Sequence, residues 1–143
     1  MLPQRERIVS QLNEKPTEEI SKLDPAARRL VDHLSLLPDE AFAKLQYLQP
    51  QVGCFNRCAF CSQSAGSDIW QFTEKGLADL FIGLRTAIDL RFPERIELGQ
   101  KIGFERRSHR PGVLFPYLDN DIASYPYLDT YIKLATAELG AQV

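Results

Sequence analysis

The chain has 143 residues, enough for one domain, and its 44% hydrophobic and 25% charged residues are ordinary for a globular protein. It carries 17 Lys and Arg against 19 Asp and Glu, a formal net charge of -2. This balance argues against a nucleic-acid partner, because nucleic-acid binders usually have a basic excess. No apolar run approaches the roughly 20 residues that span a bilayer, and the polar N-terminus lacks the apolar stretch of a signal peptide. We therefore expect a soluble, cytoplasmic protein without a membrane partner.

The first 43 residues predict a helical leader. Residues 4–13 favour a short helix that ends before Pro16. Asp24 and Pro25 open a second helix, because a carboxylate at the N-cap and Pro at the first position are typical of a helix start. One apolar face follows at helical spacing: Ala27, Leu30, Val31, Leu34 and Leu37. Residues 38–40 predict the start of another short helical turn.

From residue 44 onward the pattern alternates between strands and helices. Residues 45–49 predict a strand that Pro50 and Gly53 break. Residues 74–91 then predict a long helix. Its apolar face consists of Leu77, Leu80, Phe81, Leu84 and Ile88.

A second strand and helix follow an irregular, charged excursion over residues 92–112. The apolar run 113–118 predicts a buried parallel strand, in which Pro116 is unusual. Residues 126–139 predict a final helix with Gly140 as its C-cap. The apolar face of this helix consists of Leu128, Tyr131, Ile132, Ala135 and Leu139.

This order of elements predicts an α/β fold of the βαβα type with parallel strands. Two strands alone do not shield their own edges, and residues 141–143 resemble the approach to a third strand. We therefore expect a helical leader over residues 1–43 and, over residues 44–143, the N-terminal part of a longer core.

All three cysteines, Cys54, Cys58 and Cys61, lie within eight residues, in the loop after the first predicted strand. An odd number of closely spaced thiols is a poor disulfide framework, and in a reducing compartment such thiols are more often metal ligands or catalytic groups. Thiolates at these spacings can hold an iron–sulfur cluster, and three ligands leave one iron of a four-iron cluster open. Gly53 permits a tight turn, and the positive charge of Arg57 favours thiolate over thiol.

With Phe60 at the aromatic position, the segment reads C-x3-C-x-aromatic-C and resembles the signature of the radical S-adenosylmethionine superfamily. The resemblance implies a partial (βα)6, TIM-like barrel, of which residues 44–143 form about the first two βα units, preceded by N-terminal helices. It implies that the three cysteines bind a [4Fe-4S] cluster, that S-adenosylmethionine chelates the fourth iron, and that Phe60 lies near the adenine.

The activity that the resemblance implies is reductive cleavage of S-adenosylmethionine, which yields methionine and a 5′-deoxyadenosyl radical that abstracts hydrogen from a substrate. An electron donor such as a flavodoxin or ferredoxin is implied as a partner. We expect a peptide or a small molecule as substrate. Because half of such a barrel is missing, we expect the 143-residue chain alone to be poorly active.

Many members of that superfamily hold the amino group of the cofactor with a Gly-Gly-Glu-like motif after the second strand. The corresponding residues here, 118–121, lack that triplet. Asp119, Asn120 and Asp121 are therefore candidates for binding the cofactor. Their alternative roles are turn formation with helix capping and, as an Asp-x-Asp pair, coordination of Mg2+.

The alternative function is a metal-binding or interaction module without catalysis, holding a structural zinc ion or an electron-carrying cluster. Zinc would need a fourth ligand, and the only histidines, His33 and His109, lack zinc-finger spacing to the cysteines. We expect His33 at the boundary of its helix and His109 in a solvated basic loop. Trp70 and Phe72 are expected to pack in the core or in a lid, with substrate contact as the alternative.

Overall fold

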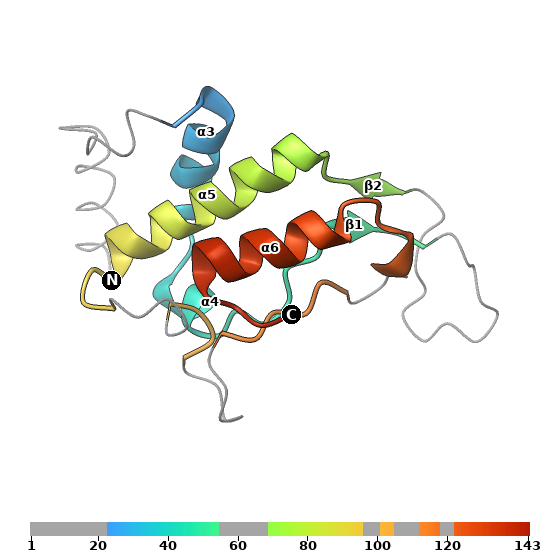
Figure 1. Ribbon diagram of the computed structural model, residues 1–143. Coiled ribbons are helices and arrows are strands. Elements are labelled where there is room, and N and C mark those ends of the chain that lie inside the picture. Colours follow the sequence, from blue (N-terminus) through green and yellow to red (C-terminus); the bar gives the residue numbers. More distant parts are fainter. Residues whose placement is uncertain (1–22, 55–68, 96–100, 105–111, 118–121) are drawn as a thin grey trace.

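The fold is described from a computed structural model, over residues 23–54, 69–95, 101–104, 112–117 and 122–143 (Figure 1). The helices of this part are α3 (Pro25–Leu34), α4 (Asp39–Ala43), α5 (Glu74–Arg91) and α6 (Leu128–Leu139), with a 3-10 turn η2 (Ile122–Ser124). Two short strands, β1 (Gln51–Val52) and β2 (Trp70–Gln71), pair in antiparallel fashion. The predicted helix over residues 4–13 lies outside the described residues.

Helix α3 begins where the sequence predicts. The Asp24 carboxylate caps it by accepting hydrogen bonds from the backbone N–H groups of Ala26 (2.8 Å) and Ala27 (3.2 Å). The helix ends at Leu34, so the expectation that Leu37 continues its apolar face was wrong, and the Leu37 side chain is 42% exposed. Pro38 explains the early end, because a residue before proline is disfavoured in helical conformation.

Helices α5 and α6 confirm the two long periodic segments, and they lie side by side (Figure 1). Every residue of the apolar face predicted for α5 is buried. On α6, which begins at Leu128, Ile132 is 40% exposed, so its placement on the buried face was wrong. Ile132 follows the buried Tyr131 by one position and is therefore turned about 100° away from it. Gly140 caps α6 with φ 61, a left-handed conformation that glycine adopts without strain.

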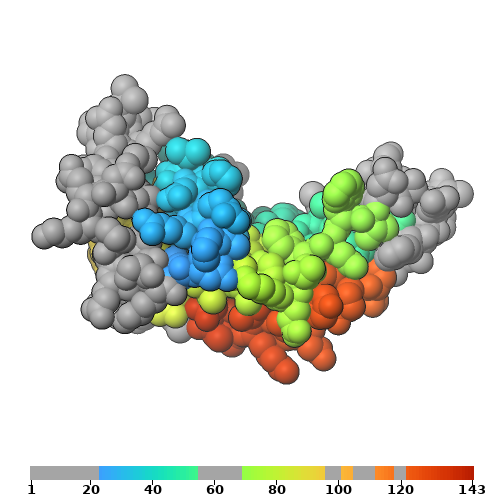
Figure 2. Space-filling view, turned by 90° about the horizontal axis from the view of Figure 1, so that it is seen from above, coloured from blue at the N-terminus to red at the C-terminus, as the bar shows by residue number. Residues whose placement is uncertain are grey.

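Helix α5 is the centre of the packing. It contacts α3 through Gly83, where a Cβ atom would lie 3.1 Å from the Leu30 Cβ, so the absent side chain lets the two helices approach closely. It contacts α6 through the apolar core, in which the Phe81 and Tyr131 rings meet edge to face at 5.2 Å. Seen from above, α3 lies at one end of the described molecule and β2 at the other (Figure 2).

The segments predicted as parallel strands meet in a short parallel ladder. Tyr47 pairs with Phe115, and Val113 pairs with Gln142, both in parallel orientation. The first pair is joined by Phe115 N–H to Gln46 C=O (2.8 Å) and Leu48 N–H to Phe115 C=O (3.1 Å). The ladder therefore consists of a first segment (46–48), a central segment (112–115) and a third segment at Gln142, with α5 and α6 in the connections.

These segments pair through single residues, and proline accounts for part of their shortness. Pro50 and Pro116 follow the first and central segments and have no N–H group to extend the ladder. Along the central segment the side chains alternate, because Leu114 is fully buried in the core whereas Val113 and Phe115 on either side of it are only partly buried. The Trp70 side chain is 74% exposed and does not pack in the core, whereas Phe72 packs partly against the core.

Candidate metal centre

Cys54 lies two residues after the end of strand β1. Gly53 before it has φ 86, a conformation that a residue with a side chain adopts only under strain. Cys54 is half-buried, and its thiol forms no disulfide with another described residue. Cys58 and Cys61 lie outside those residues, as does Phe60, so the convergence of the three thiols stays a prediction.

The two stretches of the chain that flank the cysteine-bearing segment lie side by side. Val52, at the end of β1, pairs with Trp70, at the start of β2, and Gln51 pairs with Gln71. The Phe72 N–H then donates to the Pro50 carbonyl (3.0 Å) and closes the base of this two-stranded ribbon. The ribbon formed by β1 and β2 is therefore the stem of the cysteine-bearing segment.

The stem is held by residues that immediately follow the second candidate segment, Asp119 to Asp121. Gln51, fully buried, donates from Nε2 to the Ser124 Oγ (3.0 Å). The Tyr125 hydroxyl donates to the Phe72 carbonyl (3.0 Å). Asp119, Asn120 and Asp121 themselves lie outside the described residues, but Ile122, the next residue, begins η2. The stem of the cysteine segment therefore contacts the turn that follows the acidic segment in the sequence.

A second tyrosine contact fixes the chain upstream of the stem. The Tyr131 hydroxyl on α6 donates to the carbonyl of Leu48 (2.8 Å), the last residue of the first ladder segment. Burial raises the pKa of Tyr131 above its usual range. Burial, with smaller contributions from Tyr127 and Glu74, raises the pKa of Tyr125 to about 12. Both hydroxyls therefore stay protonated near neutral pH and remain donors.

Sequence reasoning missed Tyr125, Ser124 and Gln51 as positioning residues. Tyr131 was predicted, but only as a core side chain. The hydrogen bonds join positions that are 73 residues apart for Gln51 and Ser124, and 53 apart for Tyr125 and Phe72. The only signal in the sequence is a polar side chain at Gln51 between Pro50 and the apolar Val52.

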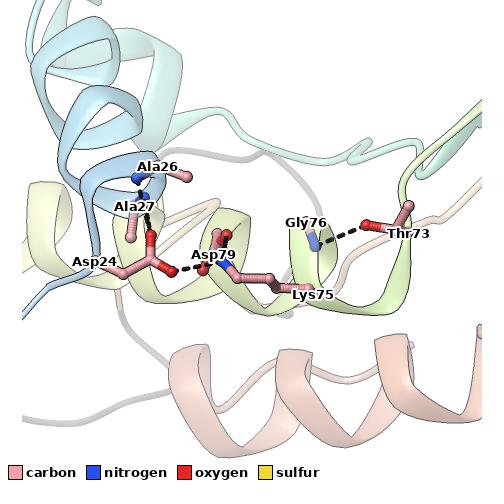
Figure 3. A network of polar contacts seen from close by, with 7 residues as sticks. All are labelled: Asp24, Ala26, Ala27, Thr73, Lys75, Gly76 and Asp79. Carbon is pink, nitrogen blue, oxygen red and sulfur yellow. Dashed lines mark hydrogen bonds and ion pairs between the residues drawn. The ribbon is translucent and has the colours of Figure 1, made fainter.

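The start of helix α5, just after the stem, is held by a polar network (Figure 3). Thr73 caps the helix by accepting from the Gly76 N–H (3.1 Å). The Lys75 ammonium lies between Asp24 (2.5 Å) and Asp79 (2.7 Å), so it joins the start of α3 to the first turns of α5. The hydrogen bond from Lys75 lowers the pKa of Asp24, and the same bond raises the pKa of Lys75.

Metal binding near the β1–β2 stem depends on which side chains can act as metal ligands there. Among the described residues, no three His, Cys, Asp or Glu side chains gather in one group. His33 is exposed in the last turn of α3, and His109 lies outside the described residues. The available donors next to the stem are therefore the thiol of Cys54 and, from the sequence, those of Cys58 and Cys61, and three soft thiolates fit an iron–sulfur cluster.

Comparison with protein-family models, with curated protein sequences and with solved structures found no match. In the part of the chain that the structure describes, no helix combines the length and the apolar character that crossing a membrane requires.

Proposed function

We propose that the chain binds a [4Fe-4S] cluster through Cys54, Cys58 and Cys61 and supports radical chemistry on S-adenosylmethionine. The supporting sequence feature is the C-x3-C-x-aromatic-C spacing of residues 54–61. The observation that carries the proposal is the position of Cys54, six residues past Leu48, at the carboxyl end of the first parallel segment. Ligands of parallel α/β folds bind at the carboxyl ends of the strands.

The connectivity supports the proposal at the level of the fold. Parallel segments joined through helices, in the order first, central, third, are how a βα barrel begins. We propose that these segments belong to the first units of a partial (βα)6 barrel. Residues 118–121 follow the central segment, so the cysteines and the acidic residues Asp119 and Asp121 both come after carboxyl ends of neighbouring segments.

The residues of the chain have separate tasks in this proposal. The three cysteines supply thiolates, and leaving a fourth iron without a protein ligand gives S-adenosylmethionine a place to bind. Asp119, Asn120 and Asp121 offer oxygen acceptors for its amino group. When bound and reduced by an external electron donor, such a cluster would supply the one electron needed for reductive cleavage of the C5′–S bond of S-adenosylmethionine, a reaction that would give methionine and a 5′-deoxyadenosyl radical for hydrogen abstraction from substrate. The proposed substrate is a peptide or a small molecule.

The first experiment is anaerobic reconstitution with iron and sulfide, followed by metal and sulfide analysis. We expect about four irons and four sulfides per chain, the content of a [4Fe-4S] cluster. The Cys58→Ala variant should lose most of this cluster, whereas Ser64→Ala, a small change in the same segment, should retain it. Stoichiometric zinc without sulfide would contradict the proposal and support the structural zinc site.

The second experiment measures activity. Dithionite-reduced, reconstituted protein is incubated with S-adenosylmethionine, and 5′-deoxyadenosine and methionine are quantified. We expect methionine and 5′-deoxyadenosine in equimolar amounts, at the low rate expected of this chain, from both the wild type and Ser64→Ala, and neither product from Cys58→Ala. A cluster that accepts electrons but yields no 5′-deoxyadenosine would identify an electron carrier.

A further inference from the structure

We infer that Tyr125 is a positioning residue for Cys54. The Tyr125 hydroxyl binds the Phe72 carbonyl and thereby holds the β1–β2 stem in place. The position of the stem in turn sets the position of the Cys54 backbone and the direction of its thiol. The inference rests on the proposed function for the role of Cys54 as a metal ligand, but the placement of the thiol is measurable without any metal.

The first step is the contact between Tyr125 and Phe72. The Tyr125 side chain is only 3% exposed, and its hydroxyl donates to the Phe72 carbonyl over 3.0 Å. The Phe72 N–H donates in turn to the Pro50 carbonyl over 3.0 Å. Both backbone polar groups of Phe72 are therefore hydrogen-bonded: its carbonyl to Tyr125, between η2 and α6, and its N–H to Pro50 across the base of the stem.

The second step is that the stem formed by β1 and β2 is too short to be stable by itself. Each strand has two residues, and both residues of β2 are exposed. A two-stranded ribbon of this size is not stable alone in water, because it buries too little apolar surface to offset the entropy of ordering its backbone. The stem therefore needs contacts with the rest of the fold to keep its position.

The third step is that two consecutive residues provide those contacts, one for each strand. Ser124 accepts from Gln51 of β1 (3.0 Å), and Tyr125 donates to Phe72, which follows β2. Cys54 comes three residues after the anchored Gln51, with Gly53 between them in a fixed left-handed turn. The orientation of the first cysteine therefore depends on the turn that follows Asp121.

The test compares Tyr125→Phe with the matched control Tyr127→Phe in the 143-residue chain. Each change removes one phenol oxygen from the same turn, but the Tyr127 hydroxyl has no hydrogen bond to the other described residues, whereas its ring lies 5.9 Å from that of Tyr125. In metal-free protein, alkylation by iodoacetamide is followed at Cys54 by mass spectrometry. We expect Tyr125→Phe to react about fivefold faster at Cys54, the effect of one net hydrogen bond on local opening, and Tyr127→Phe to match the wild type.

A second readout is spectroscopic. After reconstitution with iron and sulfide and reduction with dithionite, the electron paramagnetic resonance spectrum of Tyr125→Phe should differ in shape from that of the wild type. The spectrum of Tyr127→Phe should not. A ligand whose backbone has shifted changes the geometry and hydrogen bonding at its sulfur, to which cluster electronics respond.

The outcomes separate the two proposals. Wild-type alkylation rates at Cys54 in folded Tyr125→Phe, or equal acceleration in both variants, would overturn the inference. If Tyr125→Phe fails to fold, Ser124→Ala tests the contact that holds the other strand, β1. An unchanged alkylation rate at Cys54 in Ser124→Ala would then contradict the inference that these contacts position Cys54. Wild-type protein that takes up no iron and sulfide contradicts the proposed function, while the alkylation result still decides the role of Tyr125.

Discussion

The Tyr131 hydroxyl on α6 donates a 2.8 Å hydrogen bond to the backbone carbonyl of Leu48, where the first ladder segment ends. In Tyr131→Phe the ring and its edge-to-face contact with Phe81 remain, but the carbonyl loses its donor. We expect the free energy of unfolding to fall by about 1–3 kcal/mol, the usual cost of leaving a buried polar group without a partner.

Urea titration measures this change, and Tyr47→Phe is the matched control because Tyr47 is 47% exposed. An equal loss of stability in both variants would show that the Leu48 contact has no special role.

A second prediction concerns alkaline pH. The pKa of Tyr125 is raised from 10.0 to about 12, mainly by burial, so the folded state holds this proton more tightly than the unfolded chain. Its contribution to stability is therefore complete below pH 10 and is lost as the pH rises from about 10 to about 12. We expect the urea midpoint of Tyr125→Phe to fall less steeply over this range than that of the wild type, whereas that of Tyr47→Phe, at a 47% exposed position, should follow the wild type.

The third prediction concerns Arg91, whose side chain is 3% exposed near the end of α5. Its guanidinium donates to the carbonyls of Ser35 (2.8 Å) and Leu37 and stacks 4.7 Å from the centre of the Phe42 ring. Burial lowers its pKa, and the Asp39 carboxylate, 3.4 Å away, opposes this shift.

Arg91→Lys should not rescue these contacts, because a compact ammonium lacks the planar fork that reaches both carbonyls. We expect a loss of about 1–3 kcal/mol in Arg91→Lys as well as in Arg91→Met, measured by urea titration. Arg28→Lys, at an exposed position of α3, should be neutral. Full stability of Arg91→Lys would show that charge alone suffices.

The fourth prediction separates the two tasks of Asp24, which caps α3 and pairs with Lys75. Asp24→Asn keeps a capping oxygen but loses the charge, whereas Asp24→Ala loses both. Thermal unfolding should therefore give melting temperatures in the order wild type, Asn variant, Ala variant. The hydrogen bond from Lys75 lowers the pKa of Asp24, so the contribution of the charge is present above the unfolded pKa and is lost on acidification. Equal melting temperatures for the two variants would assign the whole effect to the ion pair.

The long helices were predictable from the sequence because they combine periodic apolar residues with capping signals. Helix α5 has both features, because Thr73 caps its start and the leucines on its apolar face are buried. Its observed bounds, residues 74–91, are those that the sequence predicts. The exposure of Ile132 and of Leu37 was not predictable in the same way, since each lies at the margin of an apolar face where the packing partner decides.

The stem of the cysteine segment was not predictable. Strands of two residues are too short to carry an alternating pattern. The pairing of Val52 with Trp70 joins residues on either side of the cysteine segment, and nothing in the local sequence predicts that they meet. The contacts of Tyr125 and Ser124 are equally invisible, because hydrogen bonds between distant positions leave no local pattern. The cysteine spacing, in contrast, is wholly local, and it alone suggested a metal ligand set before any geometry was known.

The connectivity of the parallel ladder also has a consequence for the order of folding. Val113 and Gln142 are 29 positions apart, whereas Tyr47 and Phe115 are 68 apart. Loop-closure entropy makes the shorter closure cheaper by about 0.8 kcal/mol, from 1.5RT times the logarithm of the ratio of lengths. We therefore expect the C-terminal pair to form first, around α6, and the segment with the cysteines to be enclosed last. A nascent chain would then keep its thiols accessible to iron and sulfide while most of its core is already formed.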